Sequence, residues 1–353
     1  MRKRPTLADV AREAGVSKTT ASLSLNGKAD ASIPESTRAR VFSAAEQLGF
    51  SPHGPARALS RRRAEVLGVV CTTDPFVHES QHLFEHGLLS AIFGRSLERG
   101  YNPLIYGFPP READGRGLIR YADRRSDAFV LVNPPIDSPL VEFLNQAGLP
   151  VVTICCRDPR ARWVDSDNVA GIRALVEHLA RFGHHRIGFF VGPEDEDNAR
   201  TRIHAFREAL AAHGLCARED WIVRFYWDSP RTAIRLNALL ADPSPPTALL
   251  AWNDYVAEHL CELLRQRGLR VPGDVSVVGF DDTPAARTAD PPLTTVRQDL
   301  MAMGRAAVDL ALESLEEGAG SCSARSVVCP VELVVRGSSG PVRAGSAAAT
   351  KAP

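Results

Sequence analysis

Short apolar runs alternate with helical stretches through most of this chain, and this alternation limits the folds that it can adopt. The runs cover residues 66–71, 102–106, 128–132, 151–155, 187–191, 222–225, 248–251 and 275–279. Strands that are apolar on both faces are typical of parallel sheets covered by helices on both sides. The sequence therefore predicts an α/β body built from two doubly wound parallel sheets in tandem.

The turns after these expected strands carry no phosphate-binding motif. The first turn of each unit lacks G-x-G-x-x-G, and the chain lacks G-x-x-x-x-G-K-[ST], so nucleotide-dependent chemistry has no support. Ligands of open α/β sheets bind beyond the carboxyl ends of the strands. We therefore expect a small-molecule site in the cleft between the two units, without a cofactor and without enzymatic activity.

The segment from Thr6 to Asn26 has the pattern of two short helices joined by a tight turn. An apolar stripe at positions 7, 10, 11 and 14 indicates the first helix, Thr6 stands at its N-cap, and Gly15 ends it. Ser17 is placed to cap a second helix over residues 18–25. This spacing is typical of a helix-turn-helix, although a small structural hairpin would show the same pattern.

Charge is segregated along the chain, and this favours DNA binding over a structural hairpin. Residues 1–63 hold twelve basic and five acidic side chains, a net charge of +7; the 353-residue chain sums to zero, which leaves −7 for the remainder. A polyanion is the simplest partner for such a basic segment. A third helix from Pro34 to Gly49, then a breaker-rich stretch over 51–60 and three arginines, predict a three-helix headpiece followed by a hinge.

Cysteine usage and hydropathy indicate the compartment. Seven cysteines without a C-x-x-C pair argue against a disulfide framework and against a zinc ribbon. The chain has no run of eighteen apolar residues, and its basic N-terminus leads into an amphipathic helix rather than a secretory apolar core. We therefore expect a cytoplasmic, nucleoid-associated protein that does not contact a membrane.

Several ordered motifs are shared with one known family. They are T-L-A-D-V-A-x-x-A-G-V-S from Thr6, S-P-x-x-x-A-R-A-L from Ser51, D-S-D-N from Asp165, G-H-H-R-I from Gly183, W-N-D from Trp252, V-P-G-D-V-S-V-V-G-F-D-D from Val271 and P-P-L-T-T-V-R-Q from Pro291. With these motifs the sequence resembles the lactose/galactose repressor (LacI/GalR) family of bacterial transcription regulators over about residues 6–339. The resemblance implies a homodimeric repressor that binds a pseudo-palindromic operator in double-stranded DNA and responds to a small-molecule, carbohydrate-like effector.

The family pattern also implies domain limits. The helix-turn-helix headpiece covers residues 1–50 and the hinge with its basic linker covers 51–63. The body over 64–339 resembles periplasmic binding proteins, with one subdomain over about 64–162 and 294–322 and a second over about 163–293 and 323–339. Residues 340–353, rich in Gly, Ser and Ala, form a flexible tail.

The resemblance places DNA contacts on the headpiece and the hinge, with the second helix in the major groove. Leu23 stands where many members have a base-reading arginine, so it contacts a thymine methyl group or is a silent surface residue. Leu59 matches the hinge leucine that wedges into the minor groove; an ordinary linker leucine is the alternative. The expected DNA-binding residues are Thr6, Ser17, Lys18, Thr19, Ser22, Leu23, Asn26, Arg57 and Leu59.

The resemblance places effector contacts in the cleft. Arg202, Asn253 and Asp281 are expected on loops after strands, where they supply donors and acceptors for a polyhydroxylated ligand. The structural alternatives are a surface ion pair for Arg202, a local backbone cap for Asp281 and a core position for Trp252. Cys155 stands where many sugar-responsive members have an aspartate. The expected effector-binding residues are Phe76, Cys155, Arg202, Trp252, Asn253 and Asp281.

Two other classes of function are compatible with parts of the sequence. Residues 78–82 fit the zinc-protease pattern H-E-x-x-H, which makes a metalloenzyme using His78 and His82 a remote alternative. No metal site is expected, because no third ligand is specified. A stand-alone small-molecule binding protein with the same body is the other alternative, and it leaves the basic headpiece unexplained.

Overall fold

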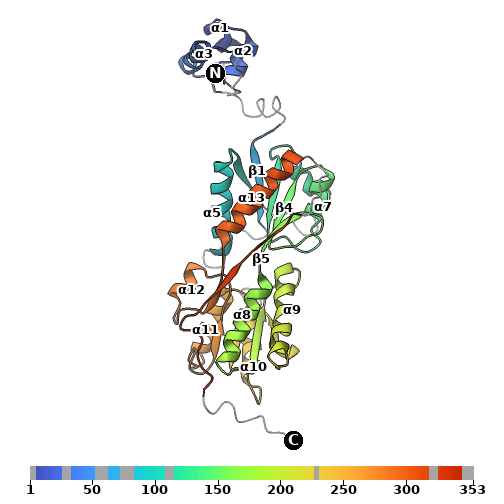
Figure 1. Cartoon of the computed structure of the whole chain (residues 1–353), viewed down its shortest axis with the longest axis vertical. Helices are drawn as coiled ribbons and strands as arrows, with labels where there is room; N and C mark the ends of the chain where they lie inside the picture. The colour runs from blue at the N-terminus through green and yellow to red at the C-terminus, as the bar shows by residue number, and fades with distance from the viewer. Residues whose placement is uncertain are drawn as a thin grey trace. The chain divides into compact units, whose positions relative to one another are not determined.

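The computed structural model describes residues 5–25, 33–51, 63–71, 83–107, 115–225, 230–317 and 325–343. The chain divides into two compact units, Met1–Glu65 and Val66–Pro353. The first is helical and the second is an α/β body with two parallel sheets, as the sequence predicted (Figure 1). In these described ranges no helix is long and apolar enough to cross a membrane.

The first unit contains α1 (Leu7–Glu13), α2 (Lys18–Leu25) and α3 (Glu35–Leu48). Thr6 caps α1 as predicted. The N–H of Asp9 donates to Thr6 Oγ1 at 3.4 Å, and the N–H of Thr6 donates to Asp9 Oδ2 at 2.9 Å, which completes a reciprocal capping box. Ser17 Oγ accepts the N–H of Thr20 at 3.0 Å at the start of α2. Bonds that are local in sequence therefore fix where both helices begin.

Small side chains fill the headpiece core. The turn after α1 and the end of α3 use Gly15 and Gly49, each with φ of 63°, a conformation that side chains disfavour. Because most core positions are alanine or valine, the three helices approach closely around one compact cluster. Its buried members are Val10, Ala11, Ala14, Ala21, Val41, Ala44 and Ala45.

The first lobe of the body is built on six parallel strands in the order β11-β5-β4-β3-β1-β2. Helices α5 (Leu83–Glu98) and α13 (Leu300–Glu317) lie side by side on one face (Figure 1). The other face is covered by α6 (Gly115–Leu118), η1 (Ile119–Tyr121) and α7 (Pro139–Gln146). The strands are β1 (Val66–Cys71), β2 (Asn102–Gly107), β3 (Ala128–Val132), β4 (Val151–Ile154), β5 (Arg162–Ser166) and β11 (Val327–Cys329).

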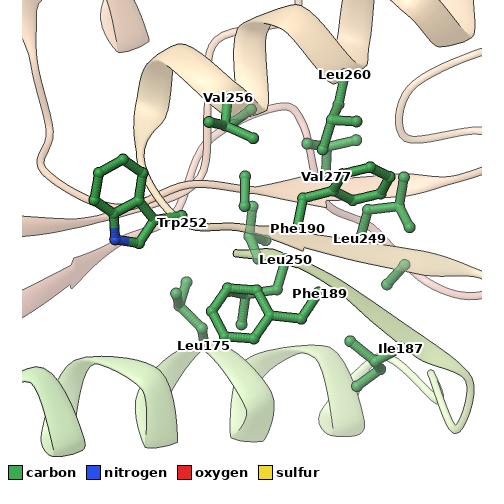
Figure 2. Close-up of a cluster of buried hydrophobic side chains, with 14 of the residues drawn as sticks. Leu175, Ile187, Phe189, Phe190, Leu249, Leu250, Trp252, Val256, Leu260 and Val277 are labelled. Atoms are coloured by element: carbon green, nitrogen blue, oxygen red, sulfur yellow. The ribbon is translucent and has the colours of Figure 1, made fainter. Parts of the chain in front are cut away.

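The second lobe is built on four parallel strands in the order β7-β6-β8-β9. Phe189 and Phe190 of β6 point to opposite faces of this sheet, toward α8 and α11 respectively (Figure 2). The strands are β6 (Ile187–Val191), β7 (Ile222–Arg224), β8 (Ala248–Ala251) and β9 (Ser276–Val278). The helical segments are α8 (Asn168–Arg181), α9 (Asp197–Ala212), η2 (Glu219–Trp221), α10 (Pro230–Leu240), α11 (Asp254–Arg265) and α12 (Pro284–Thr288).

The chain passes between the lobes at positions 166–168, 298–300 and 329–331. Two of these passages adjoin an antiparallel pair, β10 (Thr295–Gln298) with β12 (Val331–Val334). Val296 of β10 is buried in the core of the second lobe, and β12 packs against that core. The passages therefore lie at the carboxyl ends of strands, where the predicted ligand cleft is expected.

Four strands were not anticipated from the sequence, namely β5, β10, β11 and β12. β5 contains Arg162, Asp165 and Ser166 and so has no apolar run, and the other three are only three or four residues long. The expected subdomain limits placed residues 163–166 and 327–329 with the second subdomain. The structure corrects this, because β5 and β11 pair within the first sheet.

Candidate functional site

The predicted DNA-reading residues lie at the start and on the outer side of α2. Ser17, Lys18 and Thr19 are exposed, and Ser22 and Leu23 are half-buried. Backbone N–H groups and the positive end of the helix dipole at such a helix start suit contact with phosphate groups. The geometry is therefore compatible with a helix that lies against a duplex, and the role of each residue stays a prediction.

The structure says little about the contacts of the remaining predicted DNA-binding residues. Thr6 is exposed at the start of α1, where its hydroxyl takes part in the capping box. Asn26, Arg57 and Leu59 lie outside the described residues, so the proposed hinge contacts are not addressed by the structure.

A cavity of about 800 Å³ lies at the boundary between the two lobes of the body. Its walls come from the start of α5, the loop after β9, and the passages at 297–301 and 330–332. Asp281 and Gln298 line it. A cavity therefore exists where the small-molecule cleft was predicted, and at least one predicted effector residue, Asp281, lines it.

Arg202 lies in the second turn of α9 and not on a loop, which corrects its expected location. Arg202 is only 3% exposed, so its side chain is buried. Nε donates to Asn168 Oδ1 at 2.7 Å, Nη1 donates to the carbonyl of Trp252 at 2.5 Å, and the guanidinium carbon stands 3.7 Å from the ring centroid of Phe280. Burial lowers the pKa of Arg202, and nearby Asp281 opposes that shift. These contacts exclude the surface ion pair that was the structural alternative.

Asp281 follows β9 in a strained backbone conformation, with φ of 117°. The residue is 7% exposed, and its Oδ1 accepts a hydrogen bond from Gln298 Nε2 at 2.6 Å. Burial raises the pKa of Asp281 well above its ordinary value, while Arg202 acts to lower it. Within the described residues its carboxylate caps no local backbone group, so the capping alternative is not supported.

Cys155 interacts electrostatically with the same arginine. It follows β4 with φ of 63° and is 2% exposed. Burial raises the pKa of this thiol well above its ordinary value, and Asp165 adds to the shift while Arg202 opposes it. Where an aspartate would bring a negative charge, this chain therefore presents a neutral thiol.

A hydrogen-bond network connects Arg202 to the first lobe. Asn168, the acceptor of Arg202 Nε, donates through Nδ2 to both carboxylate oxygens of Asp165 at 3.0 and 3.1 Å. Arg157 Nε donates to Asp165 Oδ2 at 2.9 Å. Both Asp165 and Asn168 belong to the D-S-D-N motif, but neither was among the predicted site residues.

Trp252 and Asn253 follow β8, and their contacts are largely structural. Trp252 is 8% exposed and belongs to the core of the second lobe (Figure 2). Asn253 Oδ1 accepts the N–H of Val256 at 2.9 Å and so caps α11. The burial agrees with the core alternative for Trp252, and effector contact by either residue stays a prediction.

Glu196 was not predicted and lies just before α9, at the lobe boundary. Its side chain bonds to Asn133 at the end of β3, and burial raises its pKa to about 7. The neighbouring Asp197 accepts the backbone N–H of Arg157 at 2.9 Å. The signal in the sequence was the run of four acidic residues at 194–197, directly after a strand that ends at the cleft.

Phe76, His78 and His82 lie outside the described residues. The H-E-x-x-H pattern and the aromatic residue at the cleft mouth are therefore not addressed by the structure. Among the side chains that it does describe, no group of three or more His, Cys, Asp or Glu residues is arranged to hold a metal ion.

Two family models match the chain. The model for bacterial regulatory proteins of the lacI family matches residues 6–53, and the model for a periplasmic binding protein-like domain matches residues 176–339. The transcriptional regulator CelR of Thermobifida fusca is 33% identical over 86% of this chain and 90% of its own length. The transcriptional repressor PurR of Photobacterium profundum is 28% identical over 88% of this chain and 92% of its own length.

Solved structures agree with these relatives. The lac repressor dimer bound to operator and the anti-inducer ONPF has a TM-score of 0.81 at 26% identity and covers 96% of this chain and 100% of its own. A complex of the regulator CelR with cellobiose has a TM-score of 0.68 at 29% identity and covers 95% of this chain and 100% of its own.

Proposed function

The chain belongs to the lacI family of bacterial regulatory proteins, and from this premise we propose that it is a repressor controlled by a small molecule. Two headpieces of a homodimer bind a pseudo-palindromic operator, and an effector in the cleft between the lobes changes that binding. DNA and effector then affect each other's affinity by the same factor.

The main support for the proposed effector site is the arrangement of Arg202 and Asp281. The two buried groups interact electrostatically. They do not form a direct ion pair in the described structure, because no guanidinium nitrogen of Arg202 lies within 4.0 Å of a carboxylate oxygen of Asp281. Buried opposite charges that do not meet directly are costly unless something polar satisfies both. A hydroxylated ligand offers donors to the carboxylate and acceptors to the guanidinium. The solved relatives with cellobiose and with ONPF support this class of ligand.

The headpiece carries the proposed DNA contacts. We assign Lys18, Thr19, Ser22 and Leu23 to the major groove and retain Leu59 as the minor-groove wedge. Residues 1–50 are the proposed headpiece and 51–63 the proposed hinge, in a protein that works in the cytoplasm on chromosomal DNA.

The alternatives are less well supported. A stand-alone binding protein has no use for a headpiece with its own core and two capped helices. The curated relatives are transcription regulators, and we propose no catalytic residue for this chain.

A pair of variants in α9 tests the proposal. Fluorescence anisotropy measures binding to the DNA that flanks the gene, with and without a panel of sugars that includes cellobiose. Arg202→Met is expected to retain DNA binding while its sugar affinity falls at least about tenfold, as the loss of charged hydrogen bonds implies. Arg207→Met is the control, because Arg207 lies on the same helix as Arg202 but pairs with the exposed Glu219 of η2. A normal sugar response in Arg202→Met would contradict the assignment.

A further inference from the structure

Asp254, the first residue of α11, holds both ends of the turn that carries Asp281. Its backbone N–H donates to the carbonyl of Phe280 at 2.8 Å, on one side of the turn. On the other side, its Oδ2 accepts the backbone N–H of Thr283 at 2.7 Å and the hydroxyl of Thr283 at 3.2 Å. One residue of a neighbouring helix therefore clamps two consecutive residues with positive φ, 281 and 282.

The same carboxylate also bonds to β10, which contacts Asp281. The hydroxyl of Thr295 in β10 donates to Asp254 Oδ1 at 2.5 Å. The N–H of Asp281 donates to the carbonyl of Val296 in this strand at 2.7 Å. Gln298, the last residue of the strand, donates through Nε2 to Asp281 Oδ1 at 2.6 Å. Asp254 therefore joins the turn to the strand that positions the Asp281 carboxylate.

The Asp254 carboxylate is buried without a cation. The residue is 1% exposed, and within the described structure it forms no ion pair. Burial raises the pKa of Asp254, while the hydrogen bonds from Thr295 and Thr283 act to lower it. A buried polar group is stable only when it is hydrogen-bonded, and here three donors meet two oxygens. Asparagine does not provide the same bonds, because its amide nitrogen would face one of these donors.

Gly279 leaves room for this arrangement. A Cβ at residue 279 would stand 2.5 Å from Asp254 Oδ1, so a side chain there would displace the carboxylate. Asp254 and Gly279 belong to the W-N-D motif and to the long motif that starts at Val271, and neither was among the predicted site residues. The two motifs therefore meet at this contact.

Asp254 does not line the cavity itself. Asp281, Thr283 and Gln298 do line it. Thr283 bonds directly to Asp254, and Gln298 belongs to the strand that Asp254 holds through Thr295. An effect of Asp254 on a ligand would therefore act through these neighbours.

We propose that Asp254 is a positioning residue of the effector site, which through Thr283 and Thr295 holds the Asp281 carboxylate in the wall of the cavity for a hydroxylated ligand. The inference rests on the proposed function and adds to it a residue that acts on the ligand without touching it.

A matched pair of variants tests this inference on the full-length protein. Thr295→Val replaces the buried hydroxyl that bonds to Asp254 with a methyl group of similar size. Thr247→Val is the control, because Thr247 is also buried and bonds to His184 Nδ1 at 2.9 Å, but it precedes β8 at the opposite end of the second sheet from the cavity. Thr295→Ser restores the hydroxyl, and Asp254→Asn removes an acceptor from the clamp itself.

Three measurements are made on each variant. Calorimetric titration gives the affinity for cellobiose and the other sugars of the panel, and anisotropy gives the affinity for operator DNA without sugar. Amide hydrogen exchange of the ligand-free protein reports on the backbone of residues 280–283. Thermal unfolding is recorded as well, because a purely structural role would change Tm without a selective change in sugar affinity.

Asp254→Asn and Thr295→Val should each lower sugar affinity at least about fivefold, since each removes a bond that holds the turn. Both should accelerate hydrogen exchange at 280–283 and keep the DNA affinity of the sugar-free protein. Thr295→Ser should recover sugar affinity to within about twofold of the wild-type value. Thr247→Val should lower Tm and leave sugar affinity unchanged.

Sugar affinity that stays within about twofold of wild type in Asp254→Asn would overturn the inference. Equal losses of sugar affinity in Thr295→Val and Thr247→Val would overturn it too, and this comparison decides alone if Asp254→Asn does not fold. A sugar response of the wild-type protein that depends on Arg202 would leave the proposed function intact in either case. If no sugar changes the Tm or the DNA binding of the wild-type protein, the inference and the sugar-responsive function fail together.

Discussion

Asp281 and Asp282 are neighbours in the chain, but their carboxylates have opposite surroundings. Asp282 meets Arg336 at 2.5 Å, Arg297 at 2.7 Å and Arg287 at 3.5 Å, and its side chain is fully buried. The carboxylate of Asp281 instead accepts a hydrogen bond from the Gln298 amide, although both aspartates line the cavity. Both residues have positive φ, 117° and 56°. The arginine cluster around Asp282 therefore anchors a strained turn that places Asp281 in the wall of the cavity.

Asp282→Asn should destabilise the body by about 2–4 kcal/mol, because it leaves several arginines without their buried partner. Burial acts to raise the pKa of Asp282, but hydrogen bonds from Arg297 and Arg336 outweigh it and the pKa lies below its ordinary value. This stabilisation is present at neutral pH and is lost only as the pH falls through that lowered pKa. Urea unfolding at pH 7 measures the effect.

Asp274→Asn serves as the control for this substitution. Asp274 pairs with Arg270 and Arg343, both of which are largely exposed. A smaller loss of stability than in Asp282→Asn is expected there, because solvent screens an exposed ion pair. An equal loss of unfolding free energy in the two variants would show that the buried cluster stabilises the body no more than an exposed ion pair does.

Glu196→Gln should change the pH dependence of stability. Burial raises the pKa of Glu196 from an ordinary 4.5 to about 7. Its contribution is therefore complete below pH 4.5 and declines as the pH rises to about 7. Relative to the variant, the wild-type protein should lose on the order of 1–2 kcal/mol of unfolding free energy between pH 5 and pH 8. Parallel curves for the two proteins would contradict this pKa.

Gly192→Ala should disturb Trp252. A Cβ at residue 192 would stand 2.5 Å from two ring atoms of Trp252, so the indole must move. Overpacking of this kind costs about 1–3 kcal/mol, and the tryptophan emission spectrum should shift with it. Gly94→Ala in α5 is the control, since a Cβ there meets nothing within 4 Å. Equal stability losses in the two variants would argue against this packing account.

Lys18→Ala should weaken DNA binding and lower the slope of log affinity against log salt concentration by about one. Arg40→Ala removes the same charge from α3, also at an exposed position. If α2 lies on the duplex, the Lys18 variant should lose more affinity than the Arg40 variant. Equal losses would mean that only the net charge of the headpiece matters.

Periodicity and local capping made most of the fold predictable. The apolar stripe of α1, its Thr6 cap and the fully apolar strands around Phe189 are properties of short segments, and the structure has them where the sequence placed them. β5 and β11 were not predicted, because their positions are set by pairing with strands that are distant in the sequence, and no local sequence pattern indicates such pairing.

The location and burial of some predicted site residues could be anticipated from the sequence. The family resemblance pointed to Arg202 and Asp281, both of which are buried in the body, but it placed Arg202 on a loop instead of in α9, and the effector contacts of both residues stay a prediction. Glu196 and Gln298 could not be found in this way, because their importance comes from burial and from a missing partner rather than from residue type. Only a three-dimensional arrangement shows which acceptors lack donors.

Footprinting on the DNA that flanks the gene, at several salt concentrations and with and without a panel of sugars that includes cellobiose, tests the central claim most directly. We expect one protected pseudo-palindromic site, bound at least about a thousandfold more tightly than random duplex, with an affinity that an effector sugar changes. Equal binding to every duplex at each salt concentration, with no effect of any ligand, would contradict it.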